Sequence, residues 1–189
     1  MKKYELTAEF IEKWGKKLFR IKALISFGSV EAGELGGYVE KEDNLAQDGD
    51  AWVCDNAWVC DNARVYGNAW VCDDARVYGN ARVCDNVMVC DNARVCDNAW
   101  VCDDADYLLI GRIGSRFSFT TFFKNKDKGI TVSCGCFLGT IAEFRAKVTD
   151  THGNNKHAKM YNLAADMAEL QILGEEYFDK LNTNKSEPF

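Results

Sequence analysis

The sequence of 189 residues lacks several features on which whole classes of protein depend. It has only two histidines, His152 and His157. No stretch approaches the roughly 20 apolar residues of a membrane-spanning helix, so we expect no membrane partner. Charged residues follow Met1, but no apolar run comes after them, so we expect no secretory signal and a cytoplasmic location.

Positive charge is scarce in the middle of the chain. Between Asp43 and Asp106 there are thirteen Asp and four Arg, whereas the whole chain carries a net charge of −6. Direct nucleic-acid binding needs a basic patch or stripe, and none exists here, so we do not expect it. We ascribe the acidic residues to turns, where Asp tolerates unusual backbone conformations.

One six-residue phrase is present in ten copies, from Ala51 to Ala105. Its first position is Ala or Val, and its third position is valine nine times in succession, from Val53 to Val101. The period is too short for a pair of helices and too regular for an ordinary globular core. It predicts a hexapeptide β-helix, a parallel solenoid in which each coil buries its apolar face by stacking on the next.

A single copy shows how the solenoid would form. Side chains of a strand alternate between its two faces, so Ala51 and Val53 point one way, and Trp52 and Cys54 point the other. The Asp-Asn pair that follows favours a turn. Alanine and valine therefore fill the interior, while Trp, Arg, Cys and Tyr face outward.

The repeat resembles that of the left-handed parallel β-helix family of hexapeptide-repeat proteins. The resemblance implies three hexads in each triangular coil, so that residues 18 apart stack in columns. It also implies three outward faces. These are Trp52, Trp70 and Met88; Trp58, Arg76 and Arg94; and Arg64, Arg82 and Trp100.

The remaining segments predict three parts: a cap at 1–32, the β-helix at 33–105 and an α+β domain at 106–189. Residues 33–50 would form a further coil, with Leu35, Val39 and Leu45 pointing inward. In the last part we expect three strands and a helix that starts at the Thr140/Glu143 capping box. A longer helix from about Lys156 carries a heptad stripe that we expect to pack on the adjoining sheet. The stripe consists of Met160, Leu163, Met167, Leu170, Gly174, Tyr177 and Leu181.

The chain as a whole resembles a type of bacteriophage and prophage protein. The phrases that carry the resemblance are KYELT at 3–7, FRIKAL at 19–24, GELGGYVEKE at 33–42 and VSCGCFLGT at 132–140. The resemblance implies a phage or prophage origin and no particular activity.

Catalytic residues known from related folds are missing. Many left-handed β-helix proteins are trimeric acyltransferases with a catalytic histidine, and some related trimers hold zinc with three histidines. No repeat position here carries a histidine, so the sequence favours a protein that is not an enzyme. An acyltransferase-like enzyme that uses His152 or His157 at a displaced site is the alternative.

Seven of the nine cysteines occupy the fourth repeat position. Stacked pairs such as Cys54 and Cys72 would lie within disulfide range, but in the cytosol we expect free thiols. Cys134 and Cys136, with His152 and His157, are weak candidates for metal ligands, because C-x-C is tighter than the usual zinc spacing. We expect neither a metal nor a cofactor.

The outward Trp and Arg side chains are the candidate binding residues, because both types are enriched where binding energy concentrates. Trp52 and Trp70 are the first choice, and Trp58, Arg76 and Arg94 the second. We expect a homo-oligomer, with a trimer favoured. The favoured function is non-catalytic binding of a host protein or a small nucleotide, as an intracellular inhibitor of host antiviral defence. A structural component of the virion is a further alternative.

Overall fold

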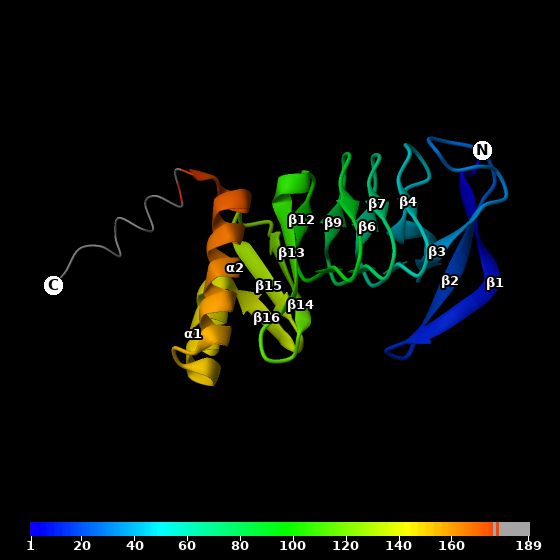
Figure 1. Cartoon of the computed structure of the whole chain (residues 1–189). Helices are drawn as coiled ribbons and strands as arrows, with labels where there is room; N and C mark the ends of the chain where they lie inside the picture. The colour runs from blue at the N-terminus through cyan, green and yellow to red at the C-terminus, as the bar shows by residue number, and fades with distance from the viewer. Residues whose placement is uncertain (176, 178–189) are drawn as a thin grey trace. The chain divides into compact units, whose positions relative to one another are not determined.

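The computed structural model describes residues 1–175 and 177, and it divides into two compact units, Met1–Asp104 and Ala105–Phe189. The first unit holds a β-solenoid, and the second holds a four-stranded sheet with two helices (Figure 1). The predicted fold class, mainly β with a solenoid followed by a small α+β unit, is confirmed. The left hand of the coil stays a prediction.

The repeat forms nine strands of two residues each, three to a coil. Strands of successive coils pair in parallel at a spacing of 18 residues, as in Trp52↔Trp70 and Trp58↔Arg76. The strands are β4 (Trp52–Val53), β5 (Trp58–Val59), β6 (Arg64–Val65), β7 (Trp70–Val71), β8 (Arg76–Val77), β9 (Arg82–Val83), β10 (Met88–Val89), β11 (Arg94–Val95) and β12 (Trp100–Val101).

The interior of the solenoid consists of the alanines and valines of the repeat. Every valine from Val53 to Val101 at the third position has no exposed surface. Burying one such side chain contributes about 1.5–3 kcal/mol, so the column of valines supplies much of the stability of the solenoid. At six corners an Asp adopts positive φ, for example 53° at Asp55, and Gly67 and Gly79 replace it at two others. Asp and Gly are suited to this left-handed conformation.

The N-terminal segment extends one face of the solenoid. Strands β1 (Tyr4–Lys13), β2 (Lys16–Ala23) and β3 (Leu35–Val39) pair antiparallel, and β3 pairs in parallel with β5. The sheet order is therefore β1-β2-β3-β5-β8-β11. The β1–β2 hairpin thus pairs with the edge of the first coil, which would otherwise be open to another chain.

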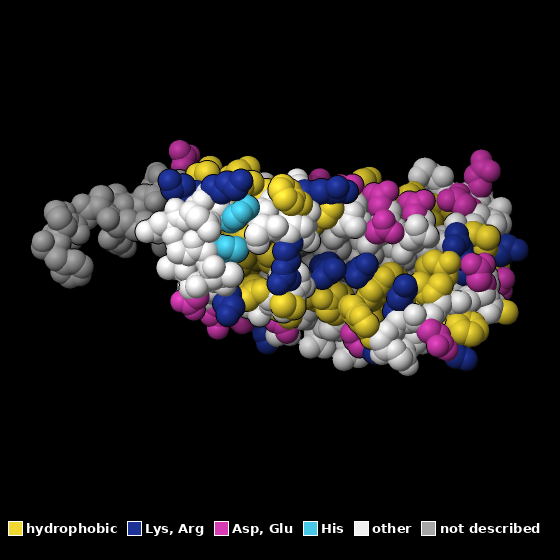
Figure 2. All heavy atoms as spheres, turned by 60° about the horizontal axis from the view of Figure 1, so that its bottom comes forward, with side chains coloured by type: hydrophobic (Ala, Val, Ile, Leu, Met, Phe, Trp, Pro, Cys, Tyr) yellow, Lys and Arg dark blue, Asp and Glu magenta, His cyan; other side chains and the backbone are white. Residues whose placement is uncertain are grey.

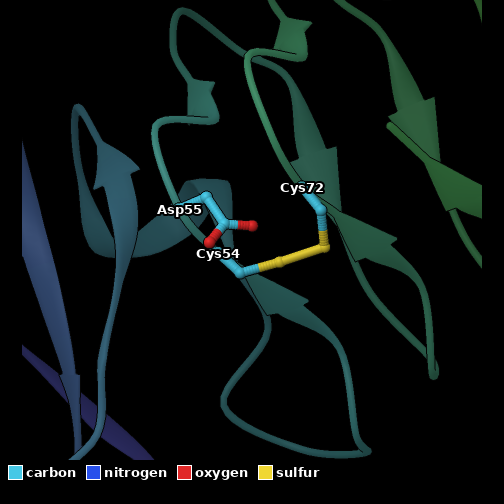
Figure 3. A group of neighbouring side chains, drawn as sticks. All are labelled: Cys54, Asp55 and Cys72. Atoms are coloured by element: carbon cyan, nitrogen blue, oxygen red, sulfur yellow. A yellow bond between two sulfur atoms is a disulfide. The ribbon is translucent and has the colours of Figure 1, made fainter. Parts of the chain in front are cut away.

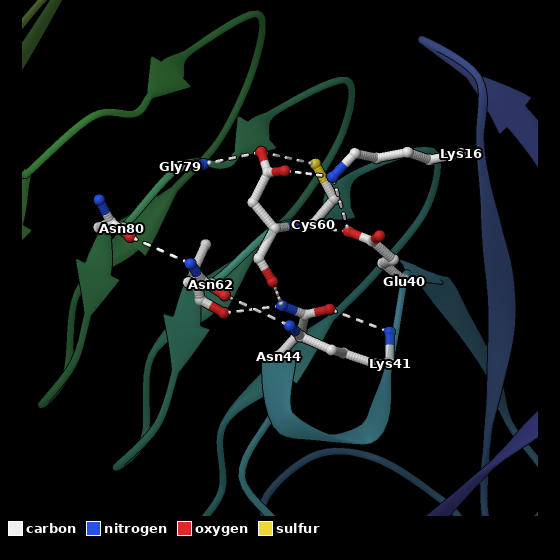
Figure 4. Close-up of polar contacts among 10 residues, drawn as sticks. Lys16, Glu40, Lys41, Asn44, Cys60, Asn62, Gly79 and Asn80 are labelled. Atoms are coloured by element: carbon white, nitrogen blue, oxygen red, sulfur yellow. Dashed lines mark hydrogen bonds and ion pairs between the residues drawn. The ribbon is translucent and has the colours of Figure 1, made fainter.

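Ion pairs connect this hairpin to the coils (Figure 4). The ammonium group of Lys16 contacts the carboxylate of Glu40 at 3.2 Å and also that of Asp61. The backbone N–H of Asp61 donates to Glu40 at 2.6 Å. Asn44, in the short helix η1 (Glu42–Asn44), donates to the carbonyl of Ala63 at 2.8 Å. These contacts satisfy backbone groups at the turn of the coil.

The coil at residues 33–50 was predicted with one error. Val39 and Leu45 are buried as expected, but Leu35 is 48% exposed. In this coil the strand pairs with the next coil at a spacing of 20 residues rather than 18, as in Tyr38↔Trp58 and Val39↔Val59. The inward position before Val39 is therefore Gly37, where a Cβ would lie 2.8 Å from Cγ1 of Val53. The regular 18-residue period did not predict this shift.

The second unit has an antiparallel sheet in the order β13-β14-β15-β16. The predicted capping box is confirmed: the backbone N–H of Thr140 donates to Glu143 at 2.8 Å, and Glu143 N–H donates to the threonine hydroxyl at 3.3 Å. Phe122, Phe144 and Tyr161 belong to its core. The elements are β13 (Tyr107–Ile113), β14 (Ser118–Lys124), β15 (Ile130–Cys134), β16 (Phe137–Thr140), α1 (Ile141–His152) and α2 (Lys156–Leu173).

The heptad stripe of α2 does not pack on the sheet, so that prediction is wrong. Leu163 is 63% and Met167 57% exposed. The buried face carries mainly alanines with Tyr161 and Ile172, because Phe122 and Phe144 already fill the core beside it. Leu181, the last predicted member, lies outside the described residues. No helix in the described part of the chain is long and apolar enough to cross a membrane.

Candidate functional site

The first outward face of the solenoid, named here the Trp–Met face, consists of Trp52, Trp70 and Met88 on β4, β7 and β10. Trp52 has no exposed surface, because Tyr4 and Phe27 pack edge-on against its ring at 6.3 and 5.4 Å. The expectation that Trp52 is an accessible binding residue is wrong, since the N-terminal segment covers it. Trp70 is half-buried and Met88 is exposed.

The second face, the Trp58 face, consists of Trp58, Arg76 and Arg94 on β5, β8 and β11. Trp58 is only 4% exposed, so the prediction of an accessible ring is wrong here too. Trp14 packs on it at 4.8 Å, and the guanidinium of Arg76 lies 5.6 Å from its ring centroid. Arg76 and Arg94 are half-buried. The tryptophan therefore attaches the hairpin to the solenoid.

The third face, the Arg–Trp face, consists of Arg64, Arg82 and Trp100 on β6, β9 and β12. All three side chains are exposed. The guanidinium of Arg82 lies 5.2 Å from the ring centroid of Trp100, which is a cation–π contact. Neither Arg64 nor Arg82 forms an ion pair with any carboxylate in the described part of the chain.

A groove of about 520 Å³ runs beside the two arginines. Tyr66 lies between them in the sequence, and Glu42, Asp43 and Asp48 form the acidic side of the groove. The groove therefore offers separate positive and negative positions. Sequence reasoning missed Tyr66 and Asp48 as lining residues, because the first coil stacks here at a spacing of 20 residues, as in Leu45↔Val65, and not at the regular 18.

The cysteines form cross-links between coils. Cys54 and Cys72 form one disulfide (Figure 3), and Cys84 and Cys102 form another, with Cα atoms 4.7 and 4.6 Å apart. The expected closeness of stacked cysteines is confirmed, whereas the expectation of free thiols, which rested on a reducing cytosol, is wrong for these four in this structure. A carboxylate lies beside each pair, such as Asp55 in Figure 3.

A third group of potential ligands, Glu40, Cys60 and Asp61, is already engaged. Lys16 pairs with both carboxylates, and the Cys60 thiol donates to Asp61 at 3.5 Å. Burial, with a smaller contribution from Asp61, raises the pKa of Cys60 to about 12. The group remains a neutral thiol at physiological pH, so this cluster is a structural contact rather than a nucleophile.

The weak metal candidates are not brought together as a ligand set. Among the described residues, no group of three ligand atoms close enough to hold an ion includes Cys134, Cys136, His152 or His157. The ring centroids of the two histidines lie 5.7 Å apart. Cys134, Cys136 and His152 do line a common cavity, which His157 does not.

The fold defines the class of the protein as a β-solenoid protein. Within it, residues 57–73, 69–85 and 75–90 match a family model described as the YdcK Beta solenoid repeat. The match covers only the central coils, so it identifies the repeat and says nothing of the terminal unit. No curated protein matches the chain.

Proposed function

We propose that the protein is a non-catalytic binding protein whose Arg–Trp face contacts a partner. The observation that carries this proposal is the exposure of Arg64, Arg82 and Trp100 in a single column. Arginine and tryptophan are the side chains most enriched at positions that dominate binding energy. On the other two faces the first tryptophan, Trp52 or Trp58, is buried by the N-terminal segment and is not accessible to a partner.

The charge pattern of the groove favours a protein partner over a free nucleotide. Arg64 and Arg82 would attract phosphates, but Glu42, Asp43 and Asp48 line the same groove and would repel them. A protein surface can present a carboxylate to the arginines and a cation to the acidic side. The nucleotide is the alternative outcome of the experiment below.

Self-association is the second element of the proposal. The exposed stripe of α2 places Met160, Leu163, Met167 and Leu170 at alternating spacings of three and four. Such spacing is typical of helices that pair through an apolar seam. A homo-oligomer, with the trimer as the favoured state, would cover this stripe.

The biological setting rests on the sequence resemblance alone. We propose a phage or prophage protein that acts in the host cytoplasm by binding a component of antiviral defence. A hexapeptide-repeat protein of phage origin with an exposed Arg–Trp face suits this role. A virion component and an acyltransferase-like enzyme are the competing possibilities.

The decisive experiment compares two double variants in infected cells. Arg64→Ala with Arg82→Ala removes both cations of the Arg–Trp face, whereas Arg76→Ala with Arg94→Ala removes two from the Trp58 face and serves as the control. Each tagged protein is captured, and bound proteins and small molecules are identified by mass spectrometry.

We expect one host protein to be retained by the wild type and the control and lost from the Arg64/Arg82 variant. A nucleotide with the same retention pattern would replace the protein partner. Recovery in purified particles would instead indicate a virion component, and turnover of acetyl-CoA an enzyme. Equal retention by both variants would contradict the Arg–Trp face as the site.

A further inference from the structure

The terminal unit contains a cavity that the solenoid function does not use. Its volume is about 340 Å³, within the range of small-molecule sites. One side of α1 forms a wall through Phe144 and Val148, which are both buried. Tyr161 of α2 and the Cys134–Phe137 turn between β15 and β16 complete it.

The charged side chains that line this cavity are all cationic or potentially cationic. Arg116 and Lys147 line it, together with His152 at the end of α1, and no Asp or Glu of the described part of the chain does. Neither Arg116 nor Lys147 has a carboxylate partner among the described residues. Figure 2 shows the histidines (cyan) at the surface, bordered by dark blue and yellow side chains.

Other cations of the same unit behave differently. Lys124 pairs with Asp106 at 2.6 Å, and Arg145 pairs with Asp166 at 2.8 Å and Glu169 at 2.6 Å. Carboxylates are therefore placed beside cations elsewhere in the unit but not at the cavity. Two unneutralised cations at one cavity favour occupation by an anion.

The inner part of the cavity is apolar and aromatic, with a hydroxyl group. Phe137 and Tyr161 each pack on Phe144 with centroids 5.6 Å apart. Burial, with a smaller contribution from the neighbouring Cys134, raises the pKa of Tyr161 to about 12, so its hydroxyl keeps its proton at neutral pH. The ring of His152 stacks on Tyr161 at 5.8 Å.

The end of α1 opposes an anion, but weakly. A helix C-terminus carries about half a negative charge. Arg116 and Lys147 contribute a full positive charge each, so the cationic field at the cavity prevails. We infer that this cavity binds a small organic anion, with one carboxylate or phosphate near Arg116 and Lys147 and a compact apolar body against Phe137 and Phe144.

The test uses the full-length protein and four probes in titration calorimetry and ligand-observed NMR. Benzoate and phenyl phosphate each combine a ring with an anionic group. Benzamide keeps the ring without the charge, and inorganic phosphate keeps the charge without the ring. We expect benzoate or phenyl phosphate to bind, whichever has the preferred anionic group, and each of the two controls to bind at least tenfold more weakly.

Three substitutions locate the binding. Arg116→Gln and Lys147→Gln, both at exposed positions, should each weaken binding about tenfold, because a charge-assisted contact is lost. Thr151→Phe should block the cavity without changing its charge. Lys126→Gln removes an exposed lysine elsewhere in the unit and should leave affinity unchanged.

Two results would overturn the inference. Benzamide that binds as tightly as benzoate would show that the cations play no part. Affinity for the anionic probes that survives Arg116→Gln, Lys147→Gln and Thr151→Phe would place the bound molecule elsewhere. Because the solenoid is unaltered in all three variants, neither result bears on the Arg–Trp face.

Discussion

The carboxylate of Asp61 accepts a hydrogen bond from the backbone N–H of Gly79, one coil further along the solenoid, at 3.0 Å. On another corner Asp73 N–H donates to Asp55 at 3.3 Å, and Asp91 N–H donates to Asp73 at 3.0 Å. The acidic residues of the repeat thus connect successive coils through backbone groups. The negative charge of the repeat is therefore explained by carboxylates that serve as hydrogen-bond acceptors between coils.

Replacement of Asp73 by Ala should destabilise the protein by roughly 1–3 kcal/mol, since it removes the acceptor for Asp91 and leaves a β-carbon at φ 57° without compensation. Asp73→Asn keeps an acceptor oxygen and a residue that tolerates this conformation, so it should lose less than half as much. Urea unfolding measures both. Equal losses of unfolding free energy in the two variants would contradict a stabilising hydrogen bond between Asp73 and Asp91.

Val89 and Met88 are adjacent in sequence and differ entirely in burial, at 0% and 52% exposed. Val89→Asp places a charge inside the solenoid and should prevent folding, whereas Met88→Asp should be tolerated within about 0.5 kcal/mol. Circular dichroism and solubility report the difference. A folded Val89→Asp protein would show that the assigned register is wrong.

Oxidised protein, unfolded without reductant, should show five reactive thiols, and nine after reduction. Reduction should also lower the unfolding free energy, by about 3 kcal/mol for each disulfide that closes an 18-residue separation. Maleimide labelling with mass spectrometry counts the thiols. Nine reactive thiols in protein purified under air would show that the cysteines are free, as the sequence analysis expects.

The buried Lys3 should make stability depend on pH. Its ammonium donates to the carbonyl of Ala51 at 2.9 Å, and burial lowers its pKa to about 8. Between pH 8 and 9.5 the unfolded chain binds the proton more strongly than the folded one, so the unfolding free energy gains a contribution that rises with pH. The advantage of wild type over Lys3→Met should therefore increase across this range.

Chemical denaturation at pH 7.5, 8.5 and 9.5 measures this difference for the two proteins. Cysteine and tyrosine titrations are common to both and cancel in the comparison. A difference that stays constant or falls with pH would contradict a depressed pKa at Lys3.

Leu163→Glu should dissociate the oligomer, because it places a charge in the apolar stripe of α2. Light scattering should give about 64 kDa for a wild-type trimer, three times 21.3 kDa, and 21.3 kDa for the variant. Leu163→Lys should also dissociate the oligomer if the loss of apolar contact, and not the sign of the charge, causes the dissociation. A wild-type mass of 21.3 kDa would refute self-association.

The repeat could be predicted in detail because its periodicity states which residues stack. The inward valines, the 18-residue register and the Thr140 capping box all follow from local spacing. The coverage of Trp52 and Trp58 could not be predicted, because it depends on Tyr4 and Trp14, which come from a non-repetitive segment. The periodicity of the repeat predicts which side chains face outward, but it does not predict which of them a distant segment covers.

The same limit applies to the terminal unit. The sequence predicts the stripe with Leu163 and Met167. It does not predict that the stripe is exposed, because Phe122 and Phe144 of other elements fill the core and leave room only for the alanine face of α2. The cavity near Arg116 and Lys147 combines residues from turns and helices without a common spacing. Only a folded structure places them together.

The 18-residue period also limits how the gene can change in length. Tandem repeats in DNA gain and lose copies by slippage. Loss of residues 69–86 would remove one coil and leave Trp100 in the column of Arg64. Loss of a single hexad, 69–74, would move the outward side chains of all the following repeats, Trp100 included, to the neighbouring face. We therefore expect descendants of this gene that keep their partner to differ by whole coils, even though its smallest repeated unit is one third as long.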